Sequence, residues 1–302
     1  MNSKYLIIIA GPTAVGKTSV SIDLAQKLNC EIISADSRQI YKEMSIGTAK
    51  PMQEEMKGIT HHFINHISIH EYFTVGDFER EVIRLLDKYF IKNDFIIMCG
   101  GTGLYIDAVC NGIDDLAKVD EAIRSKINSN YNQLGLEWLQ EQVKLQDPEY
   151  FSIVDQKNPA RLKRALEVIE TTGNKFSVQR TASVKKRNFI PIKILLNDDR
   201  ELLYERINNR VDLMIKNGLI EEARNLFPHK SLNALNTVGY KELFNYFDGK
   251  LDLNEATEEI KKNSRRYAKR QLTWFNKTKD YTVFNVSEKN KILDFINTFN
   301  AI

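Results

Sequence analysis

The first strand, turn and helix of this chain are encoded by residues 5–18, which read YLIIIAGPTAVGKT. The apolar run at 5–10 has the length of a buried strand, and residues 11–18 match the pattern GxxxxGK(S/T). A glycine-rich turn between a buried strand and a helix is the setting of a phosphate-binding P-loop. The predicted diphosphate- or nucleotide-binding residues are Gly11, Pro12, Thr13, Ala14, Val15, Gly16, Lys17 and Thr18.

In such a loop, backbone N–H groups surround a diphosphate or triphosphate, and the helix N-terminus favours the anion. Lys17 would add a positive charge, and the Thr18 hydroxyl would bind Mg²⁺. Phosphate binding does not by itself indicate phosphoryl transfer, because the strand predicted at 95–99 is followed by Gly100-Gly101-Thr102-Gly103. Many P-loop phosphotransferases carry an Asp for Mg²⁺ at that point.

Strand and helix patterns alternate in the first 112 residues of the chain and again from residue 188 onward. In the first part we predict strands over 5–10, 31–34 and 95–99 and helices over 18–28 and 75–90. In the second part we predict strands over 192–196 and 281–286, helices over 200–217, 220–227 and 253–275, and a terminal helix. This alternation predicts an α/β fold with a P-loop NTPase-like parallel sheet flanked by helices.

Residues 113–187 contain no strand-like run, and the next such run begins at residue 192. Within this stretch, breaks at Asp147-Pro148 and Asn158-Pro159 separate the predicted helices. We therefore predict a helical insertion domain at 113–187. The P-loop α/β core would then consist of residues 1–112 and 188–302.

The net charge of +3 is unevenly distributed along the chain. Residues 157–187 contain nine Lys or Arg against Glu167 and Glu170, a net charge of +7, and residues 261–279 contain eight and no acid, a net charge of +8. Two basic blocks on an otherwise acidic chain favour a surface that binds a polyanion, with nucleic acid the leading candidate. Either block taken alone is more often a solvated helix face.

Bulk properties exclude several classes of protein. A chain of 302 residues with 42% hydrophobic content can bury a full core, so a disordered protein is excluded. The longest apolar run, at 5–10, is too short for a signal sequence or a membrane span, which predicts a cytoplasmic protein. Cys30, Cys99 and Cys110 are not spaced as CxxC and are predicted to be buried thiols. The histidines between residues 61 and 70 lack the acids or cysteines of a metal site, so we interpret them as loop or core residues.

Polar side chains follow the strand predicted at 31–34. Asp36 would lie at the same edge of the sheet as the P-loop, where it could act as a general base for a weakly acidic donor such as a nucleobase amine. The commoner role of an isolated Asp-Ser pair is a turn or helix cap. Thr102 would direct its hydroxyl to the same crevice, although a GGTG turn is as often only a tight strand-to-helix connection.

Six ordered blocks of this sequence resemble the tRNA dimethylallyltransferases (tRNA isopentenyltransferases) of bacterial type. The blocks span nearly the whole chain and are GPTAVGKT (11–18), DSRQIY (36–41) with GTAKP (47–51), GGTGLY (100–105), RLKRALE (161–167), VGYKE (238–242) and AKRQLTWF (268–275). The resemblance implies transfer of the dimethylallyl group from dimethylallyl diphosphate to the exocyclic N6 amine of the adenine 3′-adjacent to the anticodon. It further implies tRNAs that read codons beginning with U, with N6-(dimethylallyl)adenosine and diphosphate as products. Mg²⁺ is the cofactor expected from the P-loop, and a monomer suits a protein that clasps one anticodon arm.

The resemblance also assigns roles to residues. Asp36 matches the general base, Thr102 a threonine that steadies the diphosphate near the breaking C–O bond, and Arg210 an arginine that binds the leaving diphosphate with Lys17. The residues that match tRNA contacts are Asp36, Ser37, Arg38, Gln39, Thr102, Arg124, Ala160, Arg161, Leu162, Lys163 and Arg164. Three positions depart from the family pattern, Ala160 and Asn236 where Gln is usual and Glu121 where Pro is frequent, and these bear on RNA contacts more than on the chemistry.

Three other functions share part of this pattern. A P-loop kinase would have the same strand, loop and helix, but would use ATP. A transferase that prenylates free adenine nucleotides would not need the basic block in the insertion. A non-enzymatic RNA-binding protein would not need Lys17, Asp36 and Thr102 around one crevice.

Overall fold

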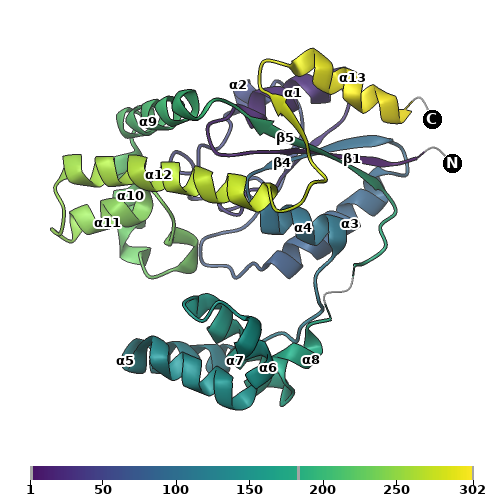
Figure 1. Ribbon diagram of the computed structural model, residues 1–302. Coiled ribbons are helices and arrows are strands. Elements are labelled where there is room, and N and C mark those ends of the chain that lie inside the picture. Colours follow the sequence, from purple (N-terminus) through teal and green to yellow (C-terminus); the bar gives the residue numbers. More distant parts are fainter. Residues whose placement is uncertain (1–2, 182–183, 301–302) are drawn as a thin grey trace. The chain divides into compact units, whose positions relative to one another are not determined.

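A six-stranded parallel sheet forms the centre of the fold, in the order β3-β2-β4-β1-β5-β6 (Figure 1). The computed structural model describes residues 3–181 and 184–300. The strands are β1 (Tyr5–Ala10), β2 (Ile32–Ser34), β3 (His61–His62), β4 (Phe95–Gly100), β5 (Ile190–Asn197) and β6 (Thr282–Asn285). The predicted α/β fold with a parallel sheet flanked by helices is therefore confirmed.

Both faces of the sheet are covered by helices, which explains why β1 is apolar throughout. Side chains of β1 alternate between the faces: Leu6 and Ile8 join one core, and Ile7 and Ile9 join the other. The first core is closed by α3 (Val75–Tyr89) and α4 (Gly103–Asn111), and the second by α1 (Lys17–Leu28) and α13 (Lys289–Asn300). Figure 1 shows these two pairs on opposite sides of the sheet.

Four further helices pack against one another on the side of the sheet where the strands end (Figure 1). They are α9 (Arg200–Lys216), α10 (Leu219–Leu226), α11 (Tyr240–Phe247) and α12 (Leu253–Phe275). Because ligands of open parallel sheets bind beyond the carboxyl ends of the strands, these helices can supply walls to a site above the P-loop.

Residues 111–186 form a compact unit of their own, distinct from the unit that contains the sheet. Its helices are α5 (Glu121–Gln146), α6 (Pro148–Ile153), α7 (Pro159–Thr172) and α8 (Phe176–Gln179). Asp147 and Asn158 cap α6 and α7, since their side chains accept the N–H groups of Tyr150 and Arg161. Each of these helices begins with proline, which suits the first helical position because its missing N–H group would be unpaired there. The corresponding sequence prediction placed an insertion domain at 113–187.

Several short elements had no counterpart among the predicted ranges, including β3, α4, α11 and α2 (Gln53–Met56). His61 and His62, which were predicted to be loop or core residues, form β3, which pairs with β2 at the edge of the sheet. A capping box begins α3, since the Thr74 hydroxyl accepts the Asp77 N–H and the Asp77 carboxylate accepts the Thr74 N–H.

The remaining sequence-level expectations concern cysteines, metals and membranes. Cys30 and Cys110 are buried, Cys99 is half-buried, and all three thiols are free. Within residues 3–181 and 184–300, no three His, Cys, Asp or Glu side chains are grouped so that they could hold a metal ion. In the same ranges, no helix combines the length and the apolar character needed to cross a membrane.

Candidate active site

The P-loop is held in a conformation that requires its two glycines. Gly16 has φ 101° and begins α1, a left-handed conformation that other residues adopt only with strain. A Cβ atom on Gly11 would lie 2.6 Å from the carbonyl oxygen of Leu196 on the neighbouring strand. The Lys17 ammonium donates to the carbonyl oxygens of Gly11 (3.0 Å) and Pro12 (2.8 Å), and burial lowers its pKa to about 8.

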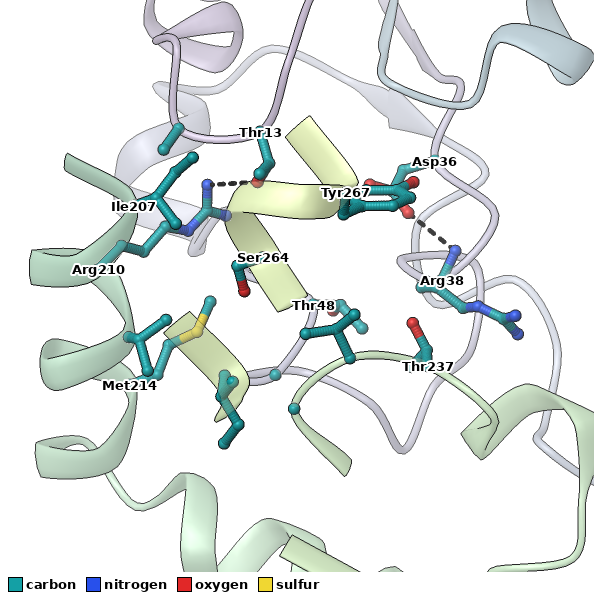
Figure 2. Close-up of a pocket in the computed structure, with 16 residues that line it drawn as sticks. Thr13, Asp36, Arg38, Thr48, Ile207, Arg210, Met214, Thr237, Ser264 and Tyr267 are labelled. Atoms are coloured by element: carbon teal, nitrogen blue, oxygen red, sulfur yellow. Dashed lines mark hydrogen bonds between the residues drawn. The ribbon is translucent and has the colours of Figure 1, made fainter. Parts of the chain in front are cut away.

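A polar cavity of about 300 Å³ lies over this loop. Lys17 and Thr18 contribute to its floor, and Asp36 from the end of β2 and Arg210 from α9 line it as well. The Arg210 guanidinium donates to the Thr13 hydroxyl at 3.4 Å (Figure 2). Burial lowers the pKa of Arg210, and the nearby Asp36 carboxylate opposes this shift. With Arg206, which also lines this cavity, three cations and one carboxylate make a site suited to a strongly charged anion.

A second cavity of about 110 Å³ adjoins the first. The two share the lining residues Thr13, Ala14, Asp36, Thr48, Arg210 and Tyr267. The second cavity adds the apolar side chains Ile207, Val211, Met214, Val238 and Ile260, of which Ile207 and Met214 are labelled in Figure 2. The two cavities therefore offer a charged half for phosphate and an apolar half for a hydrocarbon group, with Asp36 lining both.

Asp36 is held by the turn that follows β2. Its Oδ1 atom accepts the N–H groups of Arg38 (2.8 Å) and Gln39 (3.4 Å), so the turn-capping role suggested by the sequence is real. No hydrogen bond reaches its Oδ2 atom from the part of the chain that the structure describes. One carboxylate oxygen thus fixes the side chain, and the other is available to a ligand.

Thr102 lies beside this turn but does not line either cavity. Its N–H donates to the carbonyl oxygen of Ala35 (3.1 Å), and its Oγ1 atom accepts the N–H of Ser37 (3.1 Å). The GGTG turn therefore joins the ends of β2 and β4, which places Thr102 where it supports the segment that carries Asp36.

Gln271 of α12 connects the P-loop to the GGTG turn. Its Oε1 atom accepts the Thr13 N–H (2.8 Å), and its Nε2 atom donates to the Gly101 carbonyl oxygen (3.0 Å). The side chain is buried, and a Cβ atom at position 101 would lie 2.0 Å from Nε2, so a larger residue there would displace the Gln271 amide.

Glu222 of α10 holds another wall of the site. Its two carboxylate oxygens accept the N–H groups of Ser45 (3.0 Å), Ile46 (2.8 Å) and Gly47 (2.9 Å) and the hydroxyl of Tyr240 (2.7 Å). Gly47 and the two residues after it line the cavities. This carboxylate therefore helps to hold the segment, together with the Gln39 amide, which donates to the carbonyl oxygens of Thr48 and Ala49 (3.2 Å each).

Comparison with known proteins agrees with this geometry. A profile of the IPP transferase family matches residues 39–278. The tRNA dimethylallyltransferase of Christiangramia forsetii is 55% identical over 295 residues, covering 97% of this chain and 98% of the relative. The tRNA dimethylallyltransferase of Flavobacterium johnsoniae is 50% identical, covering 97% of each chain. This chain belongs to the IPP transferase family.

Solved structures of the family share the fold. The full-length tRNA isopentenylpyrophosphate transferase of Bacillus halodurans has a TM-score of 0.72 and 37% sequence identity, covering 98% of this chain and 96% of its own. A eukaryotic dimethylallyltransferase acting on tRNA has a TM-score of 0.80 and 26% identity, covering 99% of this chain and 80% of its own. The resemblance to this family that the sequence motifs indicated is therefore confirmed.

Three of the residues predicted to contact tRNA lie around the two cavities. Asp36, Arg38 and Gln39 line one or both of them. The Arg38 guanidinium is engaged within the chain, since it donates to the carbonyl oxygens of Asn233 (3.1 Å) and Ala234 (3.0 Å). Arg38 therefore also supports the segment before Val238, which lines the apolar cavity.

The predicted tRNA contacts of the 111–186 unit differ in accessibility. Arg161 is exposed, as is Ala160, and forms no ion pair within the described residues. Lys163 donates to the Asn128 side chain at 2.9 Å, and Arg164 pairs with Glu167 at 3.6 Å.

The two other positions in this unit are largely enclosed. Arg124 is 15% exposed and pairs with Glu121 (3.2 Å) and Glu167 (3.7 Å). Leu162 is fully buried in the core of its unit, so its side chain is not available to RNA.

Sequence reasoning did not identify Tyr267, Gln271 and Glu222 as parts of the site. Tyr267 and Gln271 are four residues apart in the second basic block, so one face of that helix points into the cavities while other positions carry the charges. That spacing was the available signal. Glu222 has no sequence signal, because the N–H groups it binds lie far away in the chain.

Proposed function

We propose that this chain transfers the dimethylallyl group of dimethylallyl diphosphate to the N6 amine of the adenine 3′-adjacent to the anticodon, in tRNAs that read codons beginning with U. The products are N6-(dimethylallyl)adenosine and diphosphate. The observation that carries the proposal is the pair of adjoining cavities, one lined by Lys17 and Arg210 and the other by apolar side chains. An allylic diphosphate has the same two halves.

The reaction is a displacement at the allylic carbon. The adenine amine forms the new C–N bond, the C–O bond breaks, and diphosphate leaves with the electron pair. P-loop N–H groups, Lys17 and Arg210 stabilise the charge that develops on the departing oxygen, which is the main catalytic contribution we assign to the protein. The Oδ2 atom of Asp36 accepts the proton that the amine releases.

The remaining residues around the cavities orient the reactants. Apolar side chains such as Val211 and Met214 exclude water from the allylic carbon, where it would compete as a nucleophile. Thr102, which the family resemblance relates to the diphosphate, acts here by holding the Ser37 N–H and so the segment that carries Asp36.

Mg²⁺ fits this arrangement. It is commonly held by one or two protein oxygens together with substrate phosphates and water, and the Thr18 hydroxyl lines the phosphate cavity. A cluster of three acids is not needed for such a site. When bound, Mg²⁺ would neutralise part of the diphosphate charge.

The tRNA partner is supported by the positions of the basic residues. Arg161 in the 111–186 unit and Lys269 and Arg270 on α12 are exposed, and none forms an ion pair with a described residue. Cations of this kind are available to the phosphates of an anticodon arm, to which we assign one protein monomer. The target base must leave the stack of its loop to reach Asp36.

The test is transfer of radiolabelled dimethylallyl diphosphate, with Mg²⁺, to unmodified tRNA and in parallel to AMP. We expect label in tRNA only. The matched variant is Asp36→Asn, which keeps the oxygen that accepts the Arg38 and Gln39 N–H groups but cannot take up a proton. Its turnover should fall by about 10²–10⁴-fold while tRNA still binds. Label in AMP alone would assign the chain to the nucleotide prenyltransferases, and no transfer to either acceptor would restore the kinase interpretation.

A further inference from the structure

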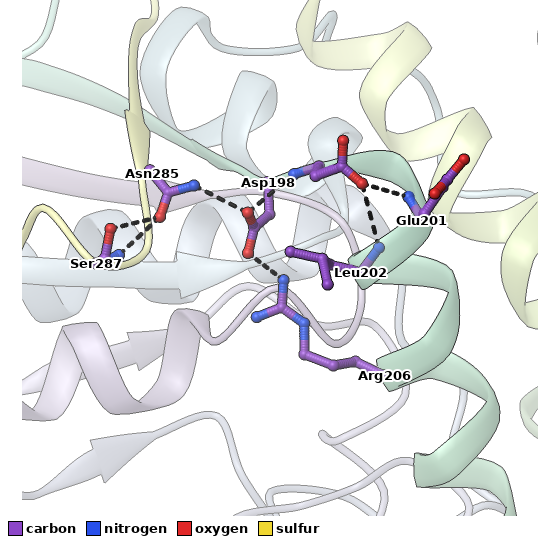
Figure 3. A network of polar contacts seen from close by, with 7 residues as sticks. Asp198, Glu201, Leu202, Arg206, Asn285 and Ser287 are labelled. Atoms are coloured by element: carbon purple, nitrogen blue, oxygen red, sulfur yellow. Dashed lines mark hydrogen bonds and ion pairs between the residues drawn. The ribbon is translucent and has the colours of Figure 1, made fainter.

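A polar network lies at the ends of β5 and β6, outside the residues assigned to the reaction (Figure 3). One carboxylate oxygen of Asp198 pairs with the Nη2 atom of Arg206. The other accepts the N–H of Asp199 (2.9 Å) and the side-chain amide of Asn285 (2.9 Å). The amide oxygen of Asn285 in turn accepts the N–H (2.9 Å) and the hydroxyl (2.7 Å) of Ser287.

The fold brings these residues together. Asn197 of β5 is in register with Asn285 of β6, so Asp198 and Asn285 emerge at the same edge of the sheet. Asp199 then caps α9 by accepting the N–H of Glu201 (2.8 Å), and α9 carries Arg206 in its second turn. The position of the arginine is therefore determined by two strand ends and a helix start.

Arg206 lines the phosphate cavity together with Lys17 and Thr18. It lies one turn before Arg210 on the same face of α9. Its side chain is 37% exposed, and Asp198 is its one hydrogen-bond acceptor within the described residues. The Nε atom is buried without a partner. A guanidinium carries five N–H donors, so most of its hydrogen-bonding capacity is unused.

We propose that Arg206 is a second diphosphate-binding arginine and that Asp198, supported by Asn285, is the residue that positions it. The proposal rests on the function proposed above, because it assigns a further contact to the same leaving group. Guanidinium groups bind phosphate oxygens through paired N–H donors, and a carboxylate that fixes the guanidinium in advance reduces the ordering cost of that contact.

A purely structural ion pair between Arg206 and Asp198 makes the opposite prediction for one variant. Asp198→Asn removes a negative charge near the phosphates, so Coulomb attraction alone would strengthen the binding of an anion. If Asp198 positions Arg206, the same variant should bind diphosphate more weakly. The sign of the change separates the two accounts.

The experiment is calorimetric titration of the full chain with inorganic diphosphate in the presence of Mg²⁺. We expect Arg206→Gln to weaken binding about tenfold to a hundredfold, since it removes charge-assisted hydrogen bonds. Arg206→Lys keeps the positive charge but lacks the paired N–H donors of the guanidinium, so its affinity for diphosphate should lie between those of the native chain and Arg206→Gln. The matched control is Arg200→Gln on the same helix, because Arg200 is exposed over the Tyr204 ring and does not line the cavity.

Asp198→Asn should weaken diphosphate binding by a smaller factor. It should also raise KM for dimethylallyl diphosphate while KM for tRNA stays unchanged. A lowered unfolding temperature with native diphosphate affinity in both variants would overturn the proposal, as would tighter binding by Asp198→Asn. Because the titration needs no turnover, failure of the transfer assay and failure of this inference are separate results.

Discussion

Replacing Glu222 by Gln tests how the segment that lines both cavities is held in place. The carboxylate accepts four hydrogen bonds, from the N–H groups of Ser45, Ile46 and Gly47 and from the Tyr240 hydroxyl. Gln has nearly the same shape, but one of its two terminal groups is an NH₂ that cannot accept. Two of the four donors therefore lose their acceptor.

The magnitude follows from those two bonds. A hydrogen bond to a charged group contributes about 1.5–3 kcal/mol, so the loss of two should lower the free energy of unfolding by roughly 3–6 kcal/mol. For a unit of this size we expect a decrease in the unfolding midpoint on the order of 10–20 °C. Tyr240→Phe removes one donor and should cost about 1–2 kcal/mol. Glu221→Gln changes the exposed neighbour of Glu222 and should change neither quantity.

The assays are thermal unfolding and steady-state transfer with each substrate varied. We expect Glu222→Gln to raise KM for dimethylallyl diphosphate, because Gly47 and Thr48 would no longer be fixed against the cavity. A variant that unfolds within about 1 °C of the native chain and keeps its KM would refute the reasoning. If Tyr240→Phe lowered the unfolding midpoint and raised KM as much as Glu222→Gln, the segment would be held by the Tyr240 hydroxyl and not by the carboxylate as a whole.

Two further predictions concern the substrates. The pKa of Lys17 is lowered to about 8, and diphosphate favours the protonated amine, so kcat/KM for dimethylallyl diphosphate should fall as pH rises above about 8. The control is Lys50→Gln, because burial also lowers the pKa of Lys50 to about 8 but Lys50 does not line either cavity. In this variant the pH at which kcat/KM falls to half should stay unchanged. A profile of kcat/KM that stays flat up to about pH 9.5 in the native enzyme contradicts the role assigned to Lys17. Arg161→Gln should raise KM for tRNA and reduce the salt dependence of tRNA binding by about one phosphate contact, with KM for the allyl donor unchanged. An unchanged salt dependence would remove Arg161 from the RNA surface.

The elements that position the P-loop were predictable because each carries a strong local pattern. The run at Tyr5–Ala10 is apolar throughout, as a strand covered on both faces must be. The missed elements are short and depend on contacts with the rest of the fold. The strand β3 has two residues, too few to show a period, and α11 begins at Tyr240, whose fully buried ring packs against the core.

The candidate site was predictable only in part. The positions of the P-loop and Asp36 follow from the topology, since the carboxyl ends of parallel strands meet at one edge. Arg210 was indicated by family resemblance alone, because nothing local shows that one face of α9 reaches the P-loop. Gln271 binds a residue 258 positions away, and Glu222 binds Gly47 from 175 positions away. Hydrogen bonds over such separations depend on tertiary packing that no sequence window contains.

The end of β4 explains why a P-loop can serve here without the acid that phosphotransferases place there. A Cβ atom on Gly100 would lie 2.2 Å from the carbonyl oxygen of Ala35, so no side chain fits at this position. The space is taken by continued pairing of β2 with β4, since the Ala35 N–H donates to Cys99 (2.8 Å) and the Thr102 N–H donates back to Ala35. That pairing carries the chain on to Asp36, which is the one acid among the described residues that line the two cavities. The packing that leaves no room for a metal-binding acid at the end of β4 therefore also supports Asp36, the carboxylate that can accept a proton. Without a further acid among the described lining residues, cations surround the diphosphate, and they stabilise the charge that develops on a leaving group.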